Sequence, residues 1–168
     1  MKTAFPTTRS SSSGFTLVEM LISVAVVTIV TVGVLNVFRQ TLYSYNETSL
    51  MRTAGVRASM GLDRMVIGVG TNAGLREAAK ASVAVTYTNT ADWQLSFTNS
   101  SSSSYQYFQY TSSNKFIFDQ SGKTICTNLI AATATNLTNG CQLSVSVAES
   151  CGGRTLTNTM TTFVQYRN

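Results

Sequence analysis

Residues 13–38 read SGFTLVEMLISVAVVTIVTVGVLNVF, and this stretch decides the fold. Between Phe15 and Phe38 the only charged side chain is that of Glu19. An α-helix rises ~1.5 Å per residue, so this segment would span roughly 36 Å, which exceeds the ~30 Å hydrocarbon core of a bilayer. The stretch therefore predicts a membrane-spanning helix over residues 15–38.

Glu19 is the exception within this apolar run. A lone carboxylate inside a membrane helix costs on the order of 2.5–3.5 kcal/mol, which makes it a candidate functional residue. Glu19 lies one helical turn after Phe15. A cut between Gly14 and Phe15 would create an α-amino cation close to this carboxylate, in the same chain or in a neighbouring one.

The segment before the apolar run, residues 1–14, is short and polar and contains Lys2 and Arg9. An ordinary secretory signal is cut after its apolar region, at small residues. No such site follows Phe38, because the next residues are Arg39, Gln40, Thr41 and Leu42. The processing point is therefore expected before the apolar segment.

This arrangement closely resembles the type IV pilin superfamily. Gly14 matches the residue before the prepilin peptidase cut, Phe15 the N-methylated first residue of the mature chain, and Glu19 its fifth-position glutamate. The resemblance covers roughly residues 1–75. It implies a leader peptide at 1–14, a transmembrane and assembly helix at 15–38, an amphipathic continuation at 39–70 and a β-rich globular domain at 71–168. An unprocessed single-pass anchor with an incidental glutamate is the alternative.

The resemblance also suggests a branch of the superfamily. Major pilins usually carry a proline near the twenty-second mature position, which here is Asn36. Residues 57–65, RASMGLDRM, loosely resemble minor pilins and the J-type pseudopilins of type II secretion. We therefore expect a minor pilin or pilin-like subunit of a type IV pilus, which primes assembly or sits at the tip for adhesion, motility or DNA uptake. A pseudopilin of a type II secretion system is the alternative.

The partners and location follow from the same resemblance. The implied partners are other pilin or pseudopilin subunits, the prepilin peptidase and methyltransferase, an inner-membrane assembly platform and the membrane. The implied location is the bacterial inner membrane, with the C-terminus outside the cytoplasm, and afterwards the pilus or pseudopilus. Nucleic acid is not an expected partner: without Lys2 and Arg9 the chain keeps ten basic and seven acidic side chains, too few and too scattered for a basic patch.

The chain has three cysteines, Cys126, Cys141 and Cys151, all in its distal half. If that half lies outside the cytoplasm, one disulfide and one remaining thiol are expected. The Cys126–Cys141 pair is favoured because residues 127–140 contain Asn and Thr turn formers, although Cys151 could take either partner. A metal site is not expected, since the chain has no histidine and no C-x-x-C pair.

The helix is expected to continue beyond the membrane. Residues 39–67 contain no proline, and their apolar side chains recur at three- and four-residue steps. This stripe, which predicts packing against the chain's own sheet, comprises Leu50, Ala54, Ala58, Leu62, Met65, Val66 and Val69. A second, partial face comprises Leu42, Tyr45, Val56 and Met60. Glycines at 68, 70 and 74 are expected to end the helix.

After the helix, the period of the apolar pattern changes to two residues. Alternating patterns predict strands over residues 83–88, 93–98, 105–111, 115–119, 142–147 and 155–166. Residues 129–137 are ambiguous and favour a short helix or irregular segment. The segments 99–104 and 127–140 are the candidate exposed loops for ligand binding. The sum is an α+β fold, with a long N-terminal helix packed on antiparallel sheet.

No catalytic constellation is visible. Histidine is absent, and the acidic residues are spread over helix, loops and strand ends without a pairing pattern. The aromatic cluster of Tyr105, Tyr107, Phe108 and Tyr110 could stack a ligand. It is better explained as the two faces of a strand, with Phe108 and Tyr110 opposite the other two. We expect no enzymatic activity and no cofactor.

Overall fold

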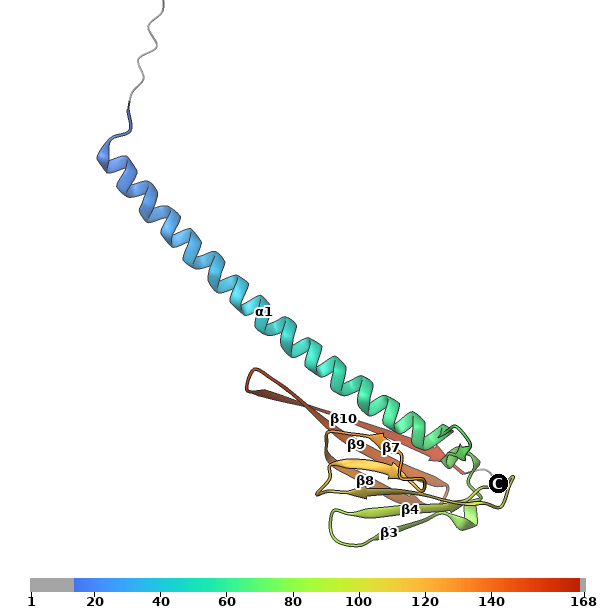
Figure 1. Cartoon of the computed structure of the whole chain (residues 1–168). Coiled ribbons are helices and arrows are strands. Elements are labelled where there is room, and N and C mark those ends of the chain that lie inside the picture. Colours follow the sequence, from blue (N-terminus) through green and yellow to red (C-terminus); the bar gives the residue numbers. More distant parts are fainter. Residues whose placement is uncertain (1–13, 167–168) are drawn as a thin grey trace, which may run out of the picture. The chain divides into compact units, whose positions relative to one another are not determined.

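The computed structural model describes residues 14–166 (Figure 1). Most of the predicted leader, residues 1–13, lies outside this range, as do the last two residues. The chain forms two compact units, Met1–Ser44 and Tyr45–Asn168. The long helix contributes to both units, and the β-strands belong to the second.

Helix α1 runs without a break from Leu17 to Ile67, as the sequence predicts. Every side chain up to Ser44 is exposed, and hydroxyls in this part bond to the carbonyl four residues earlier, as Thr28 does to Val24 O at 2.7 Å. Burial begins in the second unit, on a stripe of small and apolar residues: Ala54, Ala58, Gly61, Leu62 and Met65. This stripe confirms the predicted packing face, whereas the second face remains exposed at Tyr45, Val56 and Met60.

The helix ends where the glycines predict. Gly68 has φ +100°, and a Cβ at this position would lie 2.2 Å from Asn72 O, so that only glycine fits. A small hairpin of β1 (Gly68–Val69) and β2 (Asn72–Ala73) follows. Two 3₁₀ turns, η1 (Leu75–Glu77) and η2 (Lys80–Ser82), then lead into the sheets.

The larger sheet is antiparallel and has five strands in chain order: β3 (Ala84–Tyr87), β4 (Trp93–Thr98), β5 (Tyr105–Thr111), β6 (Phe116–Asp119) and β7 (Thr124–Cys126). Its inner face alternates as predicted, with Trp93, Leu95 and Phe97 buried on β4. On β5, Phe108 and Tyr110 face the core while Tyr105 is exposed, which confirms the expected division of this aromatic cluster into two strand faces.

The smaller sheet is antiparallel, with the order β10-β9-β8. Its strands are β8 (Leu129–Leu137), β9 (Gly140–Cys151) and β10 (Arg154–Gln165). The expected helix or loop over residues 129–137 is wrong, because these residues form β8. Its buried positions are Leu129, Ala132 and Ala134, and alanine and asparagine have low β-propensity, so pairing with β9 rather than local preference makes this segment a strand.

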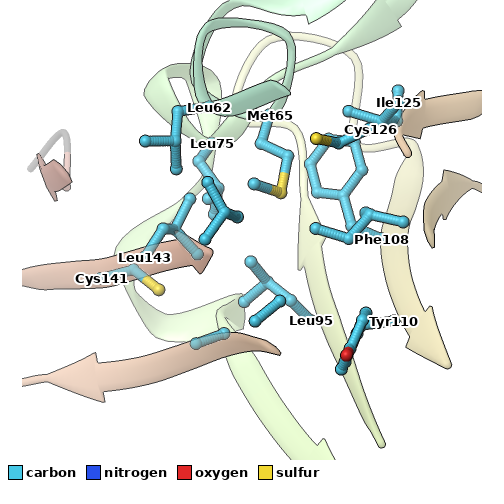
Figure 2. Packing of buried hydrophobic residues seen from close by; sticks show 14 of the residues in the cluster. Leu62, Met65, Leu75, Leu95, Phe108, Tyr110, Ile125, Cys126, Cys141 and Leu143 are labelled. Atoms are coloured by element: carbon cyan, nitrogen blue, oxygen red, sulfur yellow. The ribbon is translucent and has the colours of Figure 1, made fainter. Parts of the chain in front are cut away.

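The helix and both sheets share one hydrophobic core (Figure 2). Leu62 and Met65 from α1 meet Leu95 and Phe108 from the larger sheet and Leu143 from the smaller one. The observed architecture is thus the expected α+β fold, a long N-terminal helix packed on antiparallel sheets.

Polar contacts fix the edges of this core. The carboxylate of Asp119, which is only 2% exposed, accepts hydrogen bonds from Asn72 Nδ2 at 3.0 Å and from Lys123 N at 2.9 Å. Burial acts to raise the pKa of Asp119, but the hydrogen bonds from Lys123, Asn72 and Ser121 outweigh it and lower the pKa below its usual value. The ionised carboxylate therefore ties the β1–β2 turn to the β6–β7 turn.

Candidate processing and assembly site

The predicted cut lies in exposed chain before the helix. Gly14 and Phe15 have no regular secondary structure and precede the first residue of α1, Leu17. Phe15 is 77% exposed, and no atom lies within 4 Å of the position that a Cβ would take on Gly14. A peptidase needs an accessible backbone outside regular secondary structure at the bond it cuts, and the Gly14–Phe15 bond has these properties. The cut and the methylation of Phe15 remain predictions.

Glu19 caps the start of the helix. Thr16 N donates to Glu19 Oε2 at 3.1 Å, and Glu19 N donates to Thr16 Oγ1 at 3.3 Å. Thr16 Oγ1 also lies 3.2 Å from Glu19 Oε2, and Thr16 O accepts from Met20 N at 3.2 Å as the first helical bond. This reciprocal pair is a capping box, in which two otherwise unsatisfied N–H groups find partners.

The capping box changes the interpretation of Glu19. The residue is not an isolated carboxylate in mid-helix, because its side chain folds back toward the helix N-terminus, where the helix dipole favours negative charge. The accepting atom bonds the amide that joins Phe15 to Thr16. The carboxylate therefore lies beside the residue that would carry the new α-amino group after a cut. The spacing Thr16-x-x-Glu19, which is the signature of this motif, is the sequence signal from which the cap could be predicted.

The surface that follows Glu19 is apolar on all sides. Within the described residues, α1 is the one helix long and apolar enough to cross a membrane, and its apolar part has no buried residue. A shallow hollow at Gly33 interrupts this surface and is lined by Val30, Gly33, Val34, Val37, Phe38 and Thr41. A helix that is apolar all round is stable in lipid or among other apolar helices.

The cysteines do not form the predicted disulfide, and all three are free thiols. Cys126 lies on β7 of the larger sheet against Gly61 of α1, whereas Cys141 lies on β9 of the smaller sheet. Figure 2 shows the two sulfurs on different sides of the core, with Met65 and Leu75 between them. Residues 129–137 between the two cysteines form β8, which pairs with β9 in the smaller sheet, whereas Cys126 lies on β7 of the larger sheet.

The two inner thiols are also poor nucleophiles. Burial raises the pKa of Cys126, and it raises the pKa of Cys141 to about 11, so both stay protonated at neutral pH. Cys151 is exposed at the end of β9. Among residues 14–166, no group of three potential metal ligands comes together.

Two segments are expected to be exposed loops, and one of them, residues 99–104, contains an exposed turn. Ser100, Ser101, Ser102 and Ser103 form an exposed turn, closed by the bond from Ser103 N to Asn99 O at 2.9 Å. The other, residues 127–140, is largely strand β8 and therefore not a loop. Its Ala132 and Ala134 carbonyls are occupied by contacts with the larger sheet.

One family model matches the part of the sequence that contains this site. Residues 9–35 match the model of the prokaryotic N-terminal methylation motif. The match supports a type IV pilin-like prepilin. No curated protein and no solved structure matches the chain. The matched segment contains Gly14, Phe15 and Glu19 together with much of the apolar helix, and it implies assembly with other pilin-type subunits and with membrane machinery.

Proposed function

We propose that the chain is a minor pilin-like subunit of a type IV pilus. Prepilin peptidase cuts after Gly14 and Phe15 is N-methylated, with the leader on the cytoplasmic side of the inner membrane. The mature helix then waits in the membrane until the assembly platform moves it into a filament, to prime assembly or occupy the tip. The protein is a substrate of these enzymes and has no catalytic role of its own. The observation that carries the proposal is the Thr16–Glu19 capping box beside the Gly14–Phe15 bond.

The capping box gives Glu19 a positional role in assembly. Apolar helices pack against each other at many axial offsets, because no single contact fixes the stagger. A carboxylate held at the helix start is costly among apolar helices until it pairs with a cation. The cation is the Phe15 amine, of the same chain or of its neighbour. Only staggers that bring these groups together satisfy both charges, so Glu19 helps to set the order of subunits.

Two measurements test this proposal. The intact mass of the protein from its native membrane should lack residues 1–14 and carry one additional methyl group. A mass that keeps the leader, in cells with active prepilin peptidase, contradicts the pilin pathway and leaves a plain membrane-anchored domain.

The Glu19→Val variant tests assembly. It should insert and be cut normally, yet its amount in sheared filaments should fall about tenfold, which corresponds to ~1.4 kcal/mol per subunit. Leu21→Val, an apolar change two residues later in the helix, is the control and should assemble normally. Thr16→Val removes the hydroxyl half of the capping box and should have a smaller effect. Normal incorporation of Glu19→Val would overturn the role of this residue.

A pseudopilin of a type II secretion system is the second candidate. The unbroken α1 at Asn36, where major pilins usually carry a proline, supports a pseudopilin as well as a minor pilin. Deletion of the gene separates the two candidates. Loss of surface filaments supports a pilus subunit, whereas loss of protein export with intact filaments supports a pseudopilin.

A further inference from the structure

The smaller sheet has two edges, and they differ in how they are covered. The β8 edge is sealed by side chains of the larger sheet. Trp93 Nε1 donates to Ala132 O at 2.8 Å, and Tyr87 Oη donates to Ala134 O at 2.9 Å. The β8 strand also carries a register shift between Leu129 and Ala131. Sealing and irregularity are two ways in which proteins prevent an edge strand from pairing with another chain.

The hydrogen-bond pattern shows which groups the β10 edge presents. Tyr166 N donates to Asn139 O, and β10 pairs with β9 without a shift from Arg154 to Gln165. Because bonded pairs alternate in an antiparallel ladder, the even-numbered residues of β10 bond to β9. The odd-numbered residues direct their N–H and C=O groups away from the sheet. Applied to β8, the same alternation leaves the carbonyls of Ala132 and Ala134 on the outer edge, where they are observed.

The β10 edge is long and unprotected. Thr155, Thr157, Thr159, Thr161 and Phe163 are all exposed. Among the described residues, no hydrogen bond reaches their outward backbone groups. The strand has 12 residues, with no proline and no bulge, and its single charged residue is Arg154 at the hairpin end. Bulges, prolines, charges and short length are the usual protections of an edge, and β10 lacks them over most of its length.

Cross-strand hydroxyl bonds hold this edge in a fixed conformation. Ser146 and Thr159 hydroxyls lie 2.7 Å apart, as do those of Ser150 and Thr155. Thr161 Oγ1 donates to Ser144 Oγ at 3.0 Å. The outward side chains of β10 are therefore ordered by β9, which lowers the entropy lost when another strand pairs with the edge.

We propose that β10 is a self-association edge that pairs antiparallel with β10 of a second copy. The occupant is a second copy because the other exposed edges cannot match this length: β3 has 4 residues and β7 has 3. The edge is also compatible with itself in charge. Pairing centred on Thr159 places Thr157 opposite Thr161 and Thr155 opposite Phe163. The two Arg154 side chains then lie at opposite ends, so no like charges meet.

This pairing is separate from the Glu19 site and goes beyond the proposed function. It would join two three-stranded sheets into one six-stranded sheet, with the outward threonines forming cross-strand pairs between copies. Each such pair stabilises an antiparallel sheet only weakly. The association is therefore expected to be reversible and dependent on concentration.

The test uses the full chain in detergent micelles under reducing conditions, so that Cys151 cannot form an intermolecular disulfide. Residue-resolved amide exchange is measured at low and high protein concentration, together with the mass of the particle. The amides of Thr157, Thr159 and Thr161 should exchange quickly when dilute and at least about tenfold more slowly in the concentrated dimer, which corresponds to ~1.4 kcal/mol of pairing. The even-numbered amides should be slow at both concentrations.

A matched pair of variants locates the contact. Thr159→Lys brings two ammonium groups together at the centre of the pairing and should abolish the dimer and the protection. Ser146→Lys is the control, because it breaks the same hydroxyl bond on the same face but lies on the central strand β9. It should still dimerise. The Glu19→Val variant should also dimerise through β10. Failure of the Glu19 proposal can therefore be distinguished from failure of the β10 proposal.

Three results would overturn the β10 proposal. One is a dimer that survives Thr159→Lys, which would place the contact elsewhere, for example on the apolar helix. Another is a monomer at every concentration. The third is protection of the odd-numbered amides only when a different pilin-like protein is added, which would make the partner another subunit.

Discussion

The two parts of helix α1 share one backbone and differ in what surrounds them. From Leu17 to Ser44 the side chains are exposed, whereas from Tyr45 to Ile67 one stripe is buried against the sheets. The first part is apolar around its whole circumference, so it needs a medium of lipid or other helices. The second part is polar except on narrow faces, and its buried positions are mostly small.

The difference shows where the stability of each part comes from. The first part depends on its environment, because its side chains are exposed and apolar around the whole helix. The second part depends on close approach, since Ala54, Ala58 and Gly61 let the helix backbone lie near the strands. A Cβ on Gly61 would lie 2.8 Å from Cys126 Sγ, whereas one on Gly33 would meet no atom within 4 Å. Substitutions in the two parts should therefore have different effects on unfolding.

The largest expected effect is the loss of a buried side chain in the second part. Leu62→Ala should lower the free energy of unfolding of the globular domain by about 2–5 kcal/mol, because Leu62 is only 5% exposed and its removal leaves a cavity. Unfolding in denaturant can be followed by the fluorescence of Trp93, the single tryptophan, which is buried in this core.

Two controls sharpen this measurement. Met60→Ala lies two residues away on the exposed face, and Leu35→Ala lies in the first part of the helix. Both should change the free energy of unfolding by less than about 0.5 kcal/mol, the usual range for surface sites. A loss with Leu35→Ala as large as that with Leu62→Ala would contradict the division of α1 into two environments.

Much of this division could be predicted from the sequence. The apolar run, the absence of proline after it and the three- and four-residue steps of Ala54, Ala58 and Leu62 together predict one helix with two environments. Most strands follow from alternation because their buried positions are large, as in Trp93, Leu95 and Phe97. In these segments the local pattern and the tertiary packing agree.

Prediction from the sequence fails where the structure depends on small residues and on pairing between distant segments. β8 is built on Ala132 and Ala134, and a register shift at its start breaks the alternation. The disulfide prediction fails for the same reason, since spacing along the chain does not reveal that Cys126 and Cys141 belong to different sheets. At the candidate site Gly14, Phe15 and Glu19 are visible in the sequence, and so is the Thr16–Glu19 spacing. The exposure of the Gly14–Phe15 bond is not.

A smaller effect is expected from added methyl groups at helix glycines. Gly61→Ala should destabilise the domain by about 1–3 kcal/mol, because the new Cβ overlaps Cys126 Cβ and Sγ. Gly33→Ala should leave unfolding of the domain unchanged. Gly55→Ala should fall between them, since its nearest neighbour is Asn158 Nδ2, the movable end of a side chain. Equal stabilities of the Gly61 and Gly33 variants would contradict the close approach of helix and strand at Cys126.

The smallest effect on the free energy of unfolding is expected at Glu47, close to the start of the second part of α1. Arg154 at the start of β10 forms an ion pair with Glu47, and both side chains are largely exposed, at 58% and 44%. Such pairs contribute about 0.2–1 kcal/mol and are screened by salt. Arg154→Gln should therefore cost less than about 1 kcal/mol in denaturant unfolding at low salt, and the difference should nearly vanish at high salt.

Arg57→Gln is the matched comparison for this ion pair. The partner of Arg57 is Glu149, whose side chain is only 12% exposed, so the substitution leaves a carboxylate that is poorly solvated. Its cost should exceed that of Arg154→Gln and persist at high salt. The two pairs join the same hairpin to the same helix, ten residues apart along α1, so their difference measures how quickly coverage of the helix increases after Tyr45. Equal costs with equal salt dependence would mean that coverage is uniform from Glu47 onward, and that the change of environment is sharp rather than gradual.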